Sequence, residues 1–267
     1  MTLNVYTMNM KKTWIGGLSP SLFITFFALL LLSMWPEFKN SISNFEELMK
    51  SNIYKAMMGE ELLSMGVGSF QNFYAMEIFT TVNFFVIFIS VFQAGSIISK
   101  EADSNTLDLM FSYPIRRWSF VLQKYFVYAT YVLIYPIATF LIALLGASVL
   151  NEELNSAALF QSHIAMWLQF LTAGSITLLV SAIFLTPEKS YGVSGAILLI
   201  MYFAESLGRV VDSLNWARNL SIFHYASPGT VFAGNGLPAG DTLVMIGVLV
   251  FCVAASLLIT EKREFAG

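Results

Sequence analysis

The chain has 267 residues, of which 57% are hydrophobic and 12% are charged, whereas a soluble domain carries about 25% charged residues. A formal net charge of −3 argues against a nucleic acid partner. The one cysteine, Cys252, excludes an internal disulfide and a cysteine metal cluster. Composition therefore predicts an all-α membrane protein with a single transmembrane domain over 1–267.

Six apolar windows are long enough to cross about 30 Å of hydrocarbon. They lie near 18–35, 79–98, 126–150, 164–185, 191–207 and 242–260. MKKTW before the first window resembles the start of a secretory signal, but no small-residue cleavage pattern follows, so we expect a retained first span. Only TPEKS at 186–190 separates the fourth and fifth windows, and Pro187 with two charges predicts a tight surface turn there.

Lysine and arginine placement predicts the orientation of these spans. Nine of them fall in the N-terminus, 99–125, 186–190 and the C-terminus, against five in 36–78, 151–163 and 205–241. We therefore expect both termini in the cytoplasm, as in a multi-pass protein of the plasma membrane. The outer loop 36–78 is expected to form short surface helices, because part of it has helical apolar spacing.

The segment 99–125 is charged and broken by a proline, although it lies between two very apolar stretches. Leu107, Met110 and Phe111 share one face of a predicted helix that Asp103 or Ser104 would cap. Pro114 ends that helix, and an interfacial helix from Trp118 follows before span 3. From the residues alone, an ordinary amphipathic connection between two spans explains the segment equally well.

Residues 100–118 of this segment resemble the cytoplasmic loop of ABC-2-type permeases. The resemblance rests on Glu101, the run 105–110 (NTLDLM) and the run 113–117 (YPIRR), with Asn105 where the family usually has glycine. Lys124 at the start of span 3, the Ser227-Pro228-Gly229 turn before the last span and a basic tail after it also fit. The resemblance covers the chain from about residue 80 to the end.

The resemblance implies a coupling helix that docks on a cytosolic ATPase, and an N-terminal elbow helix at 1–17 along the inner leaflet. The coupling residues would be Glu101, Asp103, Thr106, Leu107, Asp108, Met110, Phe111, Pro114 and Arg116. It also implies two copies of the ATP-binding subunit and a second permease subunit, identical or homologous. The sequence has no G-x-x-x-x-G-K-[ST] phosphate loop, so ATP and magnesium are expected in the partner, and no cofactor in this chain.

Three ionisable residues near predicted span ends are candidates for a substrate exit path: Glu77, Glu205 and Arg209. Glu205 and Arg209 are spaced i and i+4, so the competing interpretation is a solvated helical ion pair of little consequence. His163 and His224 have no neighbouring ligands at metal-binding spacing, so we expect no metal site. No catalytic residues are recognisable, so the chain is not expected to be an enzyme.

The sequence thus predicts the permease subunit of an ABC-2-type, ATP-driven exporter. Two alternatives stay open: a secondary transporter driven by an ion gradient, and a membrane anchor or sensor subunit that does not transport. The first predicts buried charges near the middle of the bilayer, which the six spans do not show convincingly. No residue identifies the substrate.

Overall fold

The computed structural model of the chain describes residues 5–41, 51–58, 68–104 and 116–263. Six helical stretches in these ranges are long and apolar enough to cross a membrane, which confirms the predicted six-span, all-α fold. Four are single helices: α10 (Arg117–Leu150), α11 (Ser156–Ile183), α12 (Pro187–Gly208) and α15 (Ala239–Lys262).

The first two stretches are built from several pieces. The first is α1 (Val5–Ser33) followed by α2 (Trp35–Asn40). The second combines α6 (Phe70–Tyr74), α7 (Thr80–Ile89) and α8 (Ser99–Asp103) with two π-helical turns, η1 (Ala75–Phe79) and η2 (Ser90–Ala94). Short helices fill the connections: α4 (Asn52–Met58), η3 (Asp212–Leu214), α13 (Asn215–Arg218), α14 (Pro228–Thr230) and η4 (Val231–Asn235).

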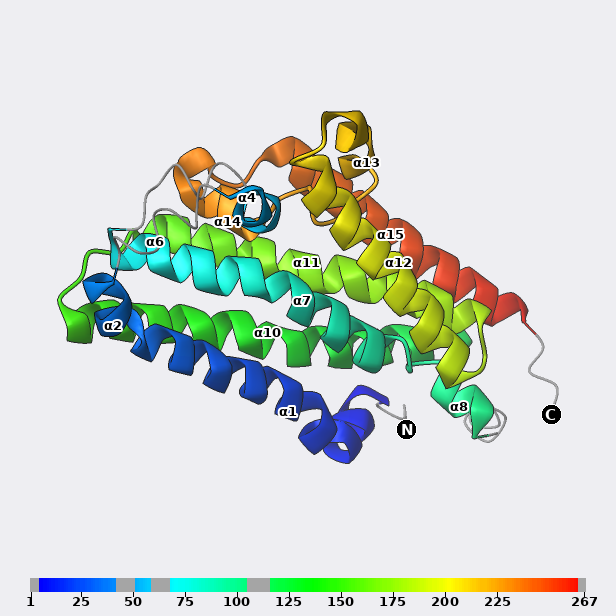
Figure 1. Cartoon of the computed structure of the whole chain (residues 1–267). Coiled ribbons are helices and arrows are strands. Elements are labelled where there is room, and N and C mark those ends of the chain that lie inside the picture. The colour runs from blue at the N-terminus through cyan, green and yellow to red at the C-terminus, as the bar shows by residue number, and fades with distance from the viewer. Residues whose placement is uncertain (1–4, 42–50, 59–67, 105–115, 264–267) are drawn as a thin grey trace.

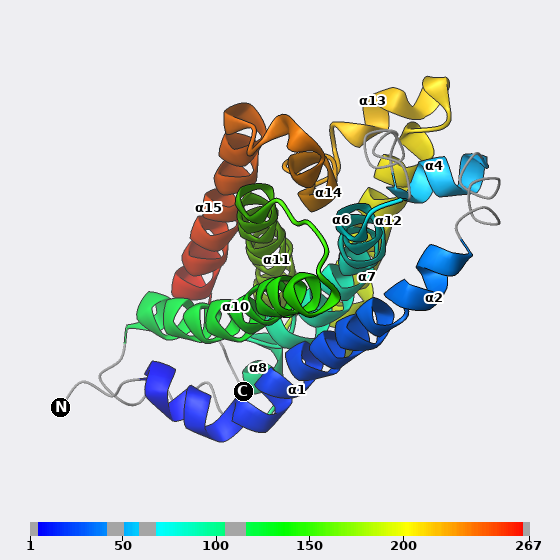
Figure 2. The same cartoon turned by 90° about the vertical axis from the view of Figure 1, so that its left-hand side faces the viewer.

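Helix α11 is the centre of the bundle. It contacts α10, α12, α15 and the second stretch, and Figure 2 shows it surrounded by these elements. In its most apolar window 78% of the residues are buried, against 17% in α15. Helix α15 therefore leaves most of its apolar surface to the bilayer or to another protein.

Small residues let these helices approach closely. A Cβ at Gly17 of α1 would overlap the Tyr131 ring of α10, and one at Gly174 of α11 would overlap the Tyr128 ring. The Tyr128 hydroxyl lies 2.6 Å from the Phe170 carbonyl oxygen and 2.9 Å from Ser90 Oγ, so it pairs with both α11 and η2. Glycine contacts and buried hydroxyl pairs thus hold α1, α10, α11 and η2 together.

Several helices are longer than the apolar windows indicate. The predicted interfacial helix from Trp118 and the predicted span 126–150 form one continuous helix, α10, so the expectation of two separate helices is wrong. No proline or glycine interrupts residues 117–126, so nothing ends the helical hydrogen-bond ladder there. Its 34 residues span about 50 Å, which carries its ends beyond the hydrocarbon layer. The helix containing predicted span 79–98 likewise begins at Phe70.

The first turns of α1 run at an angle to the rest of the helix (Figures 1 and 2). Pro20 lies inside α1 and lacks the N–H that would bond to the Gly16 carbonyl, which is an ordinary cause of a helix bend. The predicted turn between spans 4 and 5 is also present, since α11 ends at Ile183 and Pro187 begins α12.

The start of α1, α8, the start of α10, the α11–α12 turn and the end of α15 lie at one end of the bundle, on the right in Figure 1. We call this the α8 end. It carries most of the chain's described basic residues: Lys11, Lys12, Lys100, Arg116, Arg117, Lys124, Lys189, Lys262 and Arg263.

Candidate functional site

The structure describes three of the predicted coupling residues. Glu101 and Asp103 are on α8, and Arg116 immediately precedes α10. Asp103 and Arg116 are exposed, whereas Glu101 is half-buried. The other six residues lie in 105–115, outside the described part of the chain: Thr106, Leu107, Asp108, Met110, Phe111 and Pro114.

Glu101 is paired within the chain. Its Oε1 lies 2.6 Å from Nζ of Lys124 on α10, and the two side chains are only 16% and 10% exposed. Lys124 also donates a hydrogen bond to the Ile97 carbonyl oxygen at 3.3 Å and lies over the Phe120 ring. Because removing either charge would leave the other poorly solvated, this pair fixes α8 to the first turns of α10.

Serine side chains fix the break between η2 and α8. Ser181 Oγ of α11 accepts hydrogen bonds from the backbone N–H groups of Ile98 and Ser99, at 3.2 and 3.0 Å. Ser190 Oγ of α12 donates to the Gly95 carbonyl oxygen at 2.7 Å. These backbone groups lie where the helical ladder is interrupted, so neighbouring helices supply the partners that the ladder does not.

Two arginines link three helices at the α8 end. Arg117 of α10 donates a hydrogen bond to the Arg263 carbonyl oxygen, and the Arg263 guanidinium donates to the Ala182 and Ile183 carbonyl oxygens at the end of α11. A cation at these carbonyls also offsets the negative end of the helix dipole. Helices α8, α10, α11, α12 and the end of α15 are therefore linked in one network.

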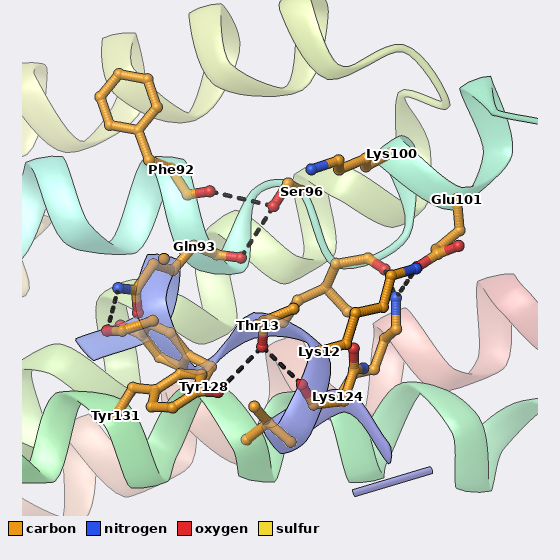
Figure 3. Close-up of a pocket in the computed structure, with 15 residues that line it drawn as sticks. Lys12, Thr13, Phe92, Gln93, Ser96, Lys100, Glu101, Lys124, Tyr128 and Tyr131 are labelled. Atoms are coloured by element: carbon orange, nitrogen blue, oxygen red, sulfur yellow. Dashed lines mark hydrogen bonds and ion pairs between the residues drawn. The ribbon is translucent and has the colours of Figure 1, made fainter. Parts of the chain in front are cut away.

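A cavity of about 410 Å³ lies beside this network (Figure 3). Its walls come from the first turns of α1, from η2 and α8, and from α10. Three lysines and one glutamate line it: Lys12, Lys100, Lys124 and Glu101. On the α1 wall, Thr13 Oγ1 lies 3.0 Å from the Tyr131 hydroxyl, and Gln93 Nε2 donates to the Gly17 carbonyl oxygen at 3.1 Å.

Glu205 is near the other end of the bundle, and it is buried, with 3% of its surface exposed. Its carboxylate lies 2.7 Å from Arg209 Nε, 3.1 Å from Arg218 Nε and 3.2 Å from His224 Nδ1. The interpretation of Glu205 and Arg209 as a solvated pair is therefore wrong. The carboxylate instead joins α12 to the segment that follows it, through two residues that helical spacing does not connect to Glu205.

The remaining candidates are separate from this cluster. Glu77 lies half-buried in η1 and makes no hydrogen bond or ion pair with a described residue. His163 is buried between the Tyr74 hydroxyl, 2.9 Å from Nε2, and the Leu159 carbonyl oxygen, 2.7 Å from Nδ1. Both ring nitrogens of His163 thus have partners inside the bundle, so neither is left for a ligand and the side chain serves to hold the helices together. Among the described residues, no three His, Cys, Asp or Glu side chains gather as metal ligands.

Comparison with known proteins gives one finding. A family model described as "ABC-2 family transporter protein" matches residues 11–260. Searches of curated proteins and of solved structures returned no match. The matched range includes all of α10, α11 and α12 and every described residue of the α8 end from Lys11 to Lys189.

Proposed function

Because the chain belongs to the ABC-2 transporter family and is a multi-pass permease of an ABC-type transporter, we propose that it moves a substrate outward, driven by a separate ATPase. Family membership implies association with an ATP-binding subunit. We place that subunit in the cytoplasm, in two copies, where it binds ATP and magnesium. A second permease subunit, identical or homologous, completes the pathway in the plasma membrane.

The observation that carries this proposal is the network at the α8 end. Helix α8 is short, carries the exposed Asp103 at its end, and is tied to α10 by the Glu101–Lys124 pair and to α11 by Ser181. A displacement of α8 by a docked ATPase would therefore reach the central helix of the bundle directly. Packed helices with few voids transmit such displacements.

We propose two different roles for the coupling residues. Glu101 has its partner inside the chain, so we assign it to bracing α8. We assign contact with the ATPase to the exposed Asp103 and Arg116 and to the segment that includes Thr106, Leu107, Asp108, Met110, Phe111 and Pro114. In this arrangement the α8 end and both termini face the cytoplasm, in agreement with the excess of basic residues there.

The docking proposal is tested with a triple variant, Leu107→Ala, Met110→Ala and Phe111→Ala, co-expressed with the ATPase. We expect loss of co-purification and of ATPase stimulation, because buried apolar anchors carry most of the affinity of such interfaces. The matched control is Leu243→Ala, Ile246→Ala and Val250→Ala, which removes apolar surface from the exposed face of α15. Unchanged co-purification and stimulation in the first variant would show that the ATPase docks elsewhere.

We further propose Glu77, Glu205 and Arg209 as candidates for an exit path at the end opposite α8. The support differs between them. Glu77 is free of partners in the described structure, so its carboxylate is available to a passing substrate. Glu205 is buried and Arg209, its partner, is half-buried, so we assign both first to holding the segment after α12 in place.

A further inference from the structure

The cavity at the α8 end carries positive charge that the described chain does not neutralise. Three lysines and one glutamate line it, which gives a formal charge of +2. Glu101 is already paired with Lys124 at 2.6 Å. Lys12 and Lys100 make no ion pair with any residue that the structure describes. A cleft lined by charge of one sign attracts a ligand of the opposite sign.

The two lysines come from different elements that meet at the cavity. Lys12 is on the bent first part of α1, and Lys100 is on α8, as Figure 3 shows. The side-chain amide of Asn9, one turn before Lys12, also lines the cavity and makes no hydrogen bond to a described residue. Two ammonium groups and one amide N–H among the lining residues provide a donor set suited to phosphate oxygens.

The surroundings of the cavity are apolar and exposed. Trp14 and Ile15 on the same turns of α1 are 55% and 65% exposed, and Phe92, which lines the cavity, is 59% exposed. Aromatic and lysine side chains at the ends of spanning helices are typical of the headgroup level of a bilayer. A ligand with a phosphate and an attached apolar chain would place its phosphate beside the lysines and its apolar chain against the exposed apolar side chains.

We infer that the cavity binds a phosphate group, with Lys12, Lys100 and Asn9 around its oxygens, and that its source is an anionic phospholipid of the adjacent leaflet. The acyl chains would follow Phe92, Trp14 and Ile15, and the bound headgroup would bridge α1 to α8. A soluble phosphate ester offers the same oxygens, so the experiment separates the two sources. Lys12 and Asn9 lie outside the coupling segment, and Lys100 is on α8 but is not one of the predicted coupling residues.

The test uses the full chain purified from vesicles of phosphatidylcholine with phosphatidylglycerol, and lipid retention is measured by native mass spectrometry. The variant Lys12→Gln with Lys100→Gln removes both cations and retains most of each stem. We expect retention of phosphatidylglycerol to fall by at least about tenfold, because the loss of even one charge-assisted hydrogen bond weakens binding by about that factor. The control Lys189→Gln with Lys262→Gln removes the same charge from exposed positions at the same end, outside the cavity.

A second variant, Gly16→Leu, adds an apolar side chain at the cavity wall without changing the charge of the cavity. Gly16 lines the cavity, and a Cβ there meets no atom within 4 Å, so the first added carbon has open space. We expect the same loss of retention as in the lysine variant. Equal retention of phosphatidylglycerol by the lysine variant, the Gly16→Leu variant and the control would overturn the inference.

The source is identified from the thermal midpoint of the protein in phosphatidylcholine. A rise on adding phosphatidylglycerol but not glycerol phosphate, dependent on Lys12 and Lys100, assigns the site to lipid. A lysine-dependent rise with glycerol phosphate assigns it to a soluble phosphate ester. If neither compound raises the midpoint of the unsubstituted chain, the phosphate site itself is disproved.

Discussion

Glu205 shows how one residue fixes a segment that the sequence alone leaves undefined. Its buried carboxylate pairs with Arg209 in the same helix, with Arg218 on α13 and with His224 beyond it. The connection between α12 and α15 contains only short helices and turns, so its backbone hydrogen bonds join residues that are close in sequence. Side chains that converge on the Glu205 carboxylate therefore fix the position of this connection against α12.

Replacing Glu205 by glutamine should lower the free energy of unfolding by about 3 kcal/mol, because two arginines then lose a buried partner. The measurement is thermal unfolding in detergent, compared with Asp212→Asn, which neutralises an exposed carboxylate on the same connection. Equal midpoints for the two variants would contradict the anchoring role. Loss of transport per folded molecule, beyond the loss of stability, would support a place for Glu205 in the exit path.

Another ion pair, formed by the carboxylate of Glu152 between two spanning helices, predicts an acid-dependent change. Hydrogen bonds from Lys39 and from the Trp35 indole hold the pKa of Glu152 below its ordinary value of 4.5. A depressed folded-state pKa stabilises the protein above the unfolded pKa, and this stabilisation is lost as the pH falls through the folded value. Since Lys39 is 54% exposed, the contribution is about 0.5 kcal/mol.

The wild-type chain should therefore unfold at a higher temperature than Glu152→Gln at pH 7. The difference should shrink as the pH drops below about 4.5, where the carboxylate becomes protonated in the unfolded and then in the folded chain. Glu153→Gln is the matched control, because Glu153 makes no ion pair with a described residue. A difference that stays constant down to low pH would contradict the pairing.

We expect helix α8 to transmit the displacement caused by the docked ATPase to the rest of the bundle. It has five residues, too few to be stable alone, and it depends on Lys124 and Ser181 for its position. Its two acidic residues differ in surroundings, since Glu101 is paired inside the chain and Asp103 is exposed. Substituting Glu101 should therefore affect the transmission of movement from α8, whereas substituting Asp103 should affect docking of the ATPase.

We expect Glu101→Gln to leave binding of the ATPase unchanged and to reduce transport-coupled ATP hydrolysis about tenfold, the effect of losing roughly 1.4 kcal/mol of coupling. Exchanging the charges with Glu101→Lys and Lys124→Glu should restore part of the loss. In contrast to Glu101→Gln, Asp103→Asn should weaken binding of the ATPase, measured as co-purification. The account is contradicted if Glu101→Gln abolishes binding while Asp103→Asn has no effect.

At the scale of the whole molecule, the bilayer explains how much the sequence could predict. Spanning length follows from hydrocarbon thickness, so apolar runs alone predicted all six helices. The same apolar runs predicted that the second spanning helix begins at residue 79 and the third at residue 126. The helices begin at Phe70 and Arg117 instead, because segments that mix polar with apolar residues stay helical although their mean hydropathy is lower.

The sites were less predictable for a different reason. The i, i+4 spacing found Arg209 beside Glu205, but Arg218 and His224 meet the same carboxylate only through the fold. Likewise Lys12 and Lys100 are 88 positions apart and share a cavity because α1 bends beside α8. Long-range convergence leaves no periodic signal in a single sequence. The family resemblance of 100–118 supplied the coupling hypothesis, which the residues alone left open.

The central claim is that a cytosolic ATPase docks on the α8 end. The direct measurement is photo-crosslinking in native membranes, with a photoreactive residue at Asp103, and the same residue at Trp216 as the control. Trp216 is 64% exposed on α13, away from the α8 end in Figure 1. We expect the Asp103 position to capture a subunit with a G-x-x-x-x-G-K-[ST] motif and the Trp216 position to capture none. Capture from Trp216 alone, or no capture from Asp103, would contradict it.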